Sequence, residues 1–167
     1  MGVKWKTTKN DFPKMERAIK QLDGKKVSVG VLGGGEQSWL ASIHEYGCKI
    51  PVTPKMRKYL AATGLYLKST TTHITIPERA FLRNGFDNNK DDVIKKAEAV
   101  LGDVIGGTMS PDQLFELIGL LMKSKIQDYA RDLDSPPLHP YTADRKGSSN
   151  PLVDSGDMIG AISYKVE

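Results

Sequence analysis

The pattern that comes nearest to catalytic chemistry lies close to the C-terminus. Leu152-Val-Asp-Ser-Gly156 has the order apolar, apolar, Asp, Ser, Gly that surrounds the carboxylate of an aspartic protease, where two such carboxylates share a proton. An aspartic protease needs a flap and further strands after this motif, but only eleven residues follow Gly156 here, and a proline-rich segment precedes the motif. We therefore expect Asp154 to cap a turn in which Gly156 allows a backbone bend. An aspartic hydrolase ranks last among the functions considered.

Other residue types with chemical potential are isolated. The loop Gly30-Val-Leu-Gly-Gly-Gly35 has neither the Gly-Lys-Ser/Thr of a P-loop nor the spacing of a dinucleotide-binding loop. The three histidines, His44, His73 and His139, are far apart, and His44-Glu45 lacks the second histidine of a zinc-protease helix. Cys48 is the only cysteine, which excludes an intrachain disulfide. We expect no enzyme, no cofactor and no metal site.

Composition favours a folded, soluble chain. Of the 167 residues, 39% are hydrophobic and 26% charged, and no apolar run approaches the length of a membrane span. The formal charge is +4, from 24 basic and 20 acidic residues spread along the chain. A nucleic-acid stripe would be more concentrated. The N-terminus, Met1 to Lys6, has no apolar segment typical of a secretion signal.

Hydrophobic spacing predicts the elements that would position these residues. We expect helices over residues 12–22, 39–46 and 91–105, and a longest helix from the Ser110 cap to about Leu133. Asn10 and Asp11 are expected to cap the first helix and Ser38 the second, which Gly47 should end. Asp91 and Asp92 are expected to open the third helix. Strands are predicted over 25–32, 70–76 and 159–166, with 70–76 pairing with 27–31. The fold class is α+β, with a small antiparallel sheet packed against long helices and extended arms.

The length fits one domain, residues 1–167, and two segments of it are predicted to be arms. Residues 48–68 mix Pro51, Pro54 and Gly64 with a short helical piece over 56–62, and we expect a mobile excursion there. Residues 134–152 contain four prolines, which should deny them helix and ladder hydrogen bonds. This second arm is expected to run extended over a surface.

The segment Ile76-Pro-Glu-Arg-Ala-Phe-Leu-Arg83 places charged and aromatic residues together at the end of a predicted strand, and surface exposure of the charges does not by itself explain this combination. If a helix begins here, Arg79 and Arg83 are four residues apart and share one face, where they could clamp a carboxylate or a neighbouring subunit. Phe81 and Leu82 would anchor that helix inward.

An ordered set of motifs resembles a known family. The motifs are Ala41-Ser-Ile-His-Glu-Tyr-Gly47, Ile76 to Arg83, Pro137-Leu, Arg145-Lys-Gly-Ser, Pro151 to Gly156 and Ile162-Ser-Tyr164. Together they resemble tailed-bacteriophage virion morphogenesis proteins of the neck or tail-completion (head–tail joining) kind, over most of the chain from Val27 onward.

The resemblance implies a homo-oligomeric ring that joins the tail to the capsid connector, without catalysis. Implied partners are connector or head-completion proteins and tail-tube or tail-terminator proteins, with passive contact to DNA in the lumen and none to a membrane. The implied location is the virion tail or neck, and the host cytoplasm during assembly. The resemblance carries over six assembly residues: Arg79, Phe81, Arg83, Arg145, Asp154 and Gly156. Ala80 stands where a proline is expected, and His139-Pro-Tyr141 replaces a more hydroxyl-rich stretch.

A nucleic-acid-binding module is the alternative function. Lys4-Trp5-Lys6 and Lys55-Met-Arg-Lys58 combine basic residues with an apolar or aromatic neighbour, as a phosphate-binding groove requires. Solvated surface charge is the more frequent explanation of such clusters.

Overall fold

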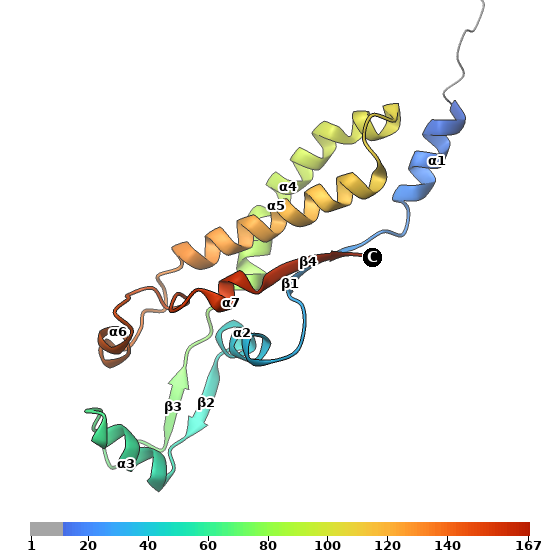
Figure 1. Cartoon of the computed structure of the whole chain (residues 1–167). Coiled ribbons are helices and arrows are strands. Elements are labelled where there is room, and N and C mark those ends of the chain that lie inside the picture. The colour runs from blue at the N-terminus through green and yellow to red at the C-terminus, as the bar shows by residue number, and fades with distance from the viewer. Residues whose placement is uncertain (1–11) are drawn as a thin grey trace, which may run out of the picture.

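Two long helices form the body of the protein in a computed structural model that describes residues 12–167. Helix α4 (Phe81–Gly106) and helix α5 (Pro111–Asp132) lie side by side along most of their length (Figure 1). The predicted Ser110 cap is confirmed as a complete capping box. Ser110 Oγ accepts from Gln113 N at 3.1 Å, and Gln113 Oε1 accepts from Ser110 N at 2.8 Å.

Helix α4 begins ten residues before the predicted start at Asp91, and with 26 residues it is longer than the 22-residue α5. Both predictions were wrong for one reason. Phe81 is fully buried, and Gly85 lets α4 approach α5 so closely that a Cβ there would lie 3.3 Å from Ile126 Cα. These tertiary contacts hold the first turns of α4 in place. Asp91 and Asp92, which we expected at the start of a helix, therefore lie inside α4 and are exposed to solvent.

The strands form two small antiparallel sheets instead of the single sheet that we predicted. Strand β1 (Val27–Val31) pairs with β4 (Ile162–Val166), and β2 (Cys48–Pro51) pairs with β3 (His73–Ile76). The predicted pairing of 70–76 with 27–31 is therefore wrong. The partner of β3 is residues 48–51, which are nearer to it in sequence than residues 27–31. We did not predict a strand there because the segment is short and ends in proline. Strand β4 starts at Ile162 because a helical turn, α7 (Asp157–Gly160), precedes it.

Residues 48–68 belong to a projecting hairpin with a helix at its tip, so the predicted excursion contains more regular structure than the short helix that we expected. Helix α3 (Pro54–Ala62) begins at Thr53, whose Oγ1 accepts from Met56 N at 3.1 Å, and the predicted short helix is confirmed. The Arg57 guanidinium donates to three carbonyls of the returning loop, at 2.7–3.2 Å. The hairpin extends away from α4 and α5 (Figure 1). Its mobility stays a prediction.

Residues 134–152 also fold back on the chain, which contradicts the prediction of an extended arm. They contain helix α6 (Pro140–Lys146), because Pro140 occupies the first turn, where a missing N–H costs nothing. Pro151 and Leu152 are buried, and Asn150 Oδ1 accepts from Leu152 N at 2.8 Å and from Val153 N at 2.9 Å. Residues 134–152 thus pack against the body of the chain, whereas the hairpin that contains residues 48–68 projects from it.

The remaining helices flank the body. Helix α1 (Phe12–Leu22) is confirmed and packs against α4 and α5; the predicted cap at Asn10 and Asp11 lies outside the described residues. Helix α2 (Glu36–Tyr46) starts three residues before the predicted Trp39. Ser38 is therefore inside the helix, not its cap, and its hydroxyl donates to the Gly33 carbonyl.

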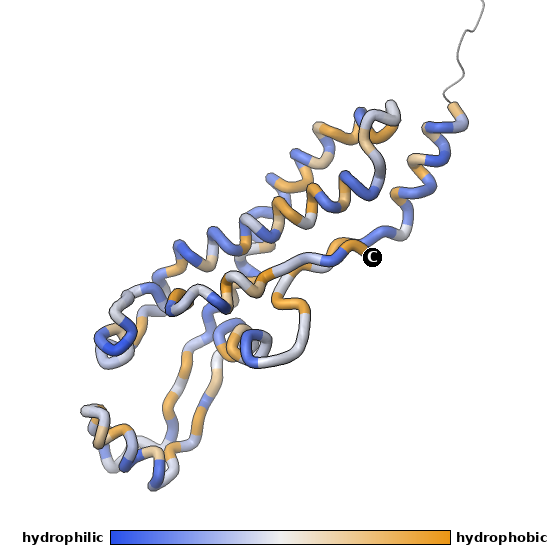
Figure 2. Tube along the Cα trace, viewed as in Figure 1, coloured by the Kyte–Doolittle hydropathy of each residue, from blue (hydrophilic) through white to orange (hydrophobic). Residues whose placement is uncertain are grey.

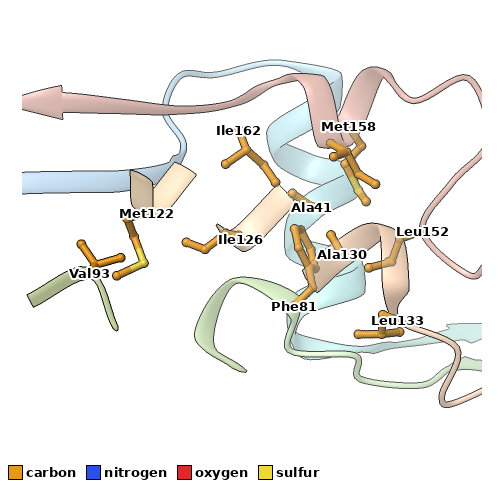
Figure 3. Packing of buried hydrophobic residues seen from close by; sticks show 11 residues of the cluster. Ala41, Phe81, Val93, Met122, Ile126, Ala130, Leu133, Leu152, Met158 and Ile162 are labelled. Atoms are coloured by element: carbon orange, nitrogen blue, oxygen red, sulfur yellow. The ribbon is translucent and has the colours of Figure 1, made fainter. Parts of the chain in front are cut away.

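One hydrophobic core joins α2, α4, α5, α7, β1 and β4. It centres on Phe81, Ile126 and Ile162, which are at most 1% exposed. Phe81 lies among Ala41, Ala130 and Leu152, which come from three other parts of the chain (Figure 3). The fold is α+β, with small antiparallel sheets packed on long helices, as predicted. Within residues 12–167, each helix is too short or too polar to cross a lipid bilayer.

Candidate interaction site

Two of the sequence motifs, residues 41–47 and 76–83, meet at one buried carboxylate. Glu45, at the end of α2, is only 3% exposed. Its Oε2 accepts from Leu82 N at 2.8 Å, and its Oε1 accepts from Arg83 N at 3.1 Å and from Arg83 Nε at 2.8 Å. The carboxylate therefore caps the first turn of α4, where negative charge complements the helix dipole. It joins the 41–47 motif to the 76–83 motif.

The backbone around this joint explains two residue choices. Ala80 precedes α4 in a left-handed conformation with φ 40°, and its side chain makes no cap hydrogen bond, so Glu45 supplies the cap from another helix. Gly47, which ends α2 as predicted, has φ 71°. A Cβ at Gly47 would lie 2.8 Å from Glu78 N and 2.9 Å from the Ile76 carbonyl oxygen. Only glycine fits this close approach.

Arg79 and Arg83 do not share a helical face, because Arg79 precedes the helix. Arg83 is half exposed and clamps carboxylates of its own chain: Glu45, and Glu78 at 2.6 Å. Its guanidinium also lies over the Tyr46 ring, 5.0 Å from the centroid. The predicted clamp of two arginines is therefore wrong: Arg83 alone binds carboxylates, and both of them belong to its own chain.

Arg79 points the other way and is 5% exposed. Its Nε donates to the Pro136 carbonyl at 3.2 Å, and one terminal nitrogen lies 3.4 Å from His44 Nδ1. Arg79 thus ties the 134–152 segment to α2. It forms no salt bridge within the part of the chain that the structure describes.

A cavity of about 510 Å³ opens where α2, α3, α6 and α7 meet, and we call it the cationic groove. Its apolar floor consists of Leu40, Leu60, Leu138, Leu152 and Met158. Its polar wall consists of His44, Tyr141, Arg145, Lys146 and Asp154. Two residues that we predicted as assembly residues, Arg145 and Asp154, therefore lie at one site.

Hydrogen bonds hold the wall of the groove in place. Tyr141 donates to Thr63 Oγ1 at 2.7 Å, which links α6 to the end of α3. Arg145 donates to the Tyr141 hydroxyl at 2.9 Å, with its guanidinium 5.7 Å from the ring centroid. Lys146 Nζ donates to the carbonyls of Asn150 and Pro151, at 3.1 and 3.3 Å. Both cations are bound to neutral groups.

The charges around the groove are unbalanced. Burial, reinforced by the positive charges of Arg79 and Lys146, lowers the pKa of His44 from 6.5 to about 4, so its ring is neutral at pH 7. Burial also lowers the Lys146 pKa, against the opposing attraction of Asp154. Among residues 12–167, no salt bridge involves Arg145 or Lys146. The site therefore combines an apolar floor with a positive wall.

The remaining predicted residues have structural positions. Phe81 is in the core, and Gly156, with φ 90°, makes the backbone bend that starts α7, as predicted. The side-chain bond in that turn joins Ser155 Oγ to Asp157 Oδ2 at 2.7 Å, so Asp154 is not the residue that closes it. Sequence reasoning missed Glu45 and Tyr141. Only the place of Glu45 inside the motif of residues 41–47 could have signalled its importance.

One arginine of the basic clusters that suggested nucleic-acid binding makes hydrogen bonds within the chain. Arg57 binds three loop carbonyls, which leaves Lys55 and Lys58 as the exposed cations of that cluster. Lys4-Trp5-Lys6 lies outside the described residues. In residues 12–167, no three His, Cys, Asp or Glu side chains gather as metal ligands would.

Comparisons with protein-family models, curated proteins and solved structures find no match for the chain. The assignment to a phage family therefore stays a prediction from the motifs.

Proposed function

We propose that the chain is a structural subunit of the tailed-phage head–tail junction or of tail completion, and that it works as a homo-oligomeric ring. The observation that carries this proposal is the order and placement of the family motifs. The 41–47 and 76–83 motifs meet at the Glu45 carboxylate, and Arg145 with Asp154 lines one groove next to it. Motifs far apart in sequence thus build one connected region.

The surface supports assembly as well. Several large aromatic side chains are mostly exposed on α2 and on the hairpin: Trp39 at 65%, Tyr46 at 67%, Tyr59 at 61% and Tyr66 at 81%. Hydrophobic residues continue along the projecting hairpin, away from the core (Figure 2). Aromatic residues are enriched at the centres of protein interfaces, because they bury a large area and keep a polar edge.

The shape gives the subunit two unlike ends. Helix α1 and the C-terminus lie at one end of the molecule, and the hairpin with α3 and α6 lies at the other (Figure 1). Contacts between unlike surfaces are head to tail, and they close into a ring when the rotation between subunits allows it. Because residues 134–152 fold back on the body and residues 48–68 form a folded, projecting hairpin, neighbours would contact the hairpin surface and not an unstructured arm. The ring would bind connector proteins on one side and tail-tube proteins on the other.

The experiment is light scattering with negative-stain microscopy over increasing protein concentration. We expect closed multi-subunit particles, and we expect the double variant Trp39→Ala/Tyr66→Ala to shift the population toward the monomer. Leu120→Ala, a change at a half-exposed residue of α5, is the matched control and should leave the oligomer intact. A wild-type chain that stays monomeric at every concentration, and also with its tail partner present, would refute the ring.

A further inference from the structure

We propose that the cationic groove binds an acidic apolar segment of an assembly partner, with a carboxylate side chain next to a large apolar one. This inference rests on the proposed function, since it names the chemistry by which a partner protein would be recognised. Trp39 and Tyr66, the two aromatic residues whose substitution tests the ring, do not line the groove, although Tyr59 lies beside Arg145 of its wall.

The first argument is the shape and lining of the groove. Its volume of about 510 Å³ lies inside the range of roughly 300–1,000 Å³ that is typical of pockets for small ligands and side chains. Leu60 of α3 and Leu138 form part of a floor that belongs to separate segments, held together by the Tyr141–Thr63 bond. A large apolar side chain that enters the groove would cover this floor, which is the main source of affinity for such a contact.

The second argument is charge. Arg79, Arg145 and Lys146 carry three positive charges near the groove, whereas Asp154 is the single acidic residue in its wall. Arg79 lies behind the lining, where its charge acts on His44 and Lys146; it is buried and has no carboxylate partner among residues 12–167, so it gains from a nearby negative charge. An incoming carboxylate would balance the excess.

The third argument is the set of donors. Arg145 binds the Tyr141 hydroxyl through one terminal nitrogen, so other N–H groups of its fork can bind a carboxylate. His44 is neutral, and the contact of its Nδ1 with Arg79 makes Nδ1 the acceptor, so Nε2 carries the proton. The wall thus presents donors. A protein segment fits better than a nucleic acid, because the floor offers leucine and methionine side chains where a phosphate backbone needs cations.

The test is a titration of the ¹⁵N-labelled full-length chain with synthetic eight-residue peptides, followed by NMR. The peptides pair Leu, Phe, Trp or Met with a following Asp or Glu, and each has a counterpart in which Asn or Gln replaces the acid. We expect at least one acidic peptide to shift the amide signals of residues 141–146 and Leu152. It should bind about tenfold more tightly than its amide counterpart, as the loss of one charge-assisted contact predicts.

Three variants make the test specific. Arg145→Gln removes an exposed cation of the wall and should weaken binding about tenfold. Leu60→Glu adds a carboxylate to the floor and should abolish binding. Lys58→Gln, an exposed residue of α3 outside the lining, is the matched control for lost positive charge and should bind as the wild type does. Circular dichroism would establish that each variant is folded.

The outcomes separate this inference from the proposed function. If no acidic peptide shifts the groove amides at millimolar concentration, or if amide counterparts bind equally well, the inference is wrong even when the chain forms rings. If acidic peptides bind the groove but the chain stays monomeric, the groove is correct and the ring is wrong. Shifts elsewhere on the surface that Lys58→Gln and Arg145→Gln weaken equally would indicate non-specific charge attraction and would also overturn the inference.

Discussion

Replacing Glu45 by Gln tests the joint between the two motifs. The substitution keeps the size of the side chain but removes its charge, and one carboxylate oxygen becomes an amide donor. Three donors now point at the carboxylate: Leu82 N, Arg83 N and Arg83 Nε. An amide can accept from only some of them, and its NH₂ group would face an N–H. The first turn of α4 would lose part of its cap.

The size of the effect follows from the burial of Glu45, which is 3% exposed. The loss of a helix N-cap costs roughly 0.5–2 kcal/mol, and each hydrogen bond to a charged group contributes about 1.5–3 kcal/mol. Since the amide still satisfies some donors, we expect a loss of about 2–4 kcal/mol in the free energy of unfolding. For a chain of this size, that corresponds to a fall in Tm of roughly 5–15 °C.

Thermal unfolding by circular dichroism, with urea unfolding for the free energy, measures this effect. Glu78→Gln is the matched control, because Glu78 also binds Arg83 but its side chain is 54% exposed. Surface ion pairs contribute little, so this control should change the Tm by no more than about 2 °C. The reasoning fails if Glu45→Gln and Glu78→Gln have the same small effect, since Glu45 would then not be the cap of α4.

Two further predictions concern packing and pH. Gly119→Ala should lower the free energy of unfolding by about 1–3 kcal/mol, because its Cβ would lie only 2.7 Å from Cγ of the Tyr164 ring. Gly102→Ala, on the open surface of α4, should raise the free energy of unfolding by about 0.5–1 kcal/mol. Urea unfolding of both variants measures these changes, and equal effects would contradict the prediction. The pKa of His44 is lowered from 6.5 to about 4 in the folded state, so the unfolded chain takes up the proton first as the pH falls. The free energy of unfolding should therefore decrease between pH 6.5 and pH 4, by about 1–2 kcal/mol after allowance for the partial exposure of the ring. His44→Gln should show a smaller loss between pH 7 and 4.5 in urea unfolding, and an unchanged loss would mean that another group is responsible.

Elements with local signals could be predicted from the sequence. The capping box at Ser110, the glycine that ends α2 at Gly47 and the alternating valines of β1 depend on residues within a few positions of each other. Each was found because the stabilising partner is close in sequence. The prediction of the α+β class rests on these elements.

What could not be predicted depends on contacts distant in sequence. The start of α4 at Phe81 requires the cap from Glu45, 37 residues away from Leu82, and the close approach of Gly85 to α5. Proline content suggested that residues 134–152 are extended, but Pro140 begins a helix and Pro151 is buried. Of the candidate site, Arg145 and Asp154 were predicted separately, and the groove that brings them together depends on how α6 packs against α3.

The most direct test of the central claim is deletion of the gene for this chain from the genome that encodes it, followed by electron microscopy of the particles that are then produced. The proposed role predicts DNA-filled heads and finished tails that remain separate, with joining restored by the wild-type gene in trans. Complete, infectious particles in the absence of the chain would contradict a role in joining head to tail.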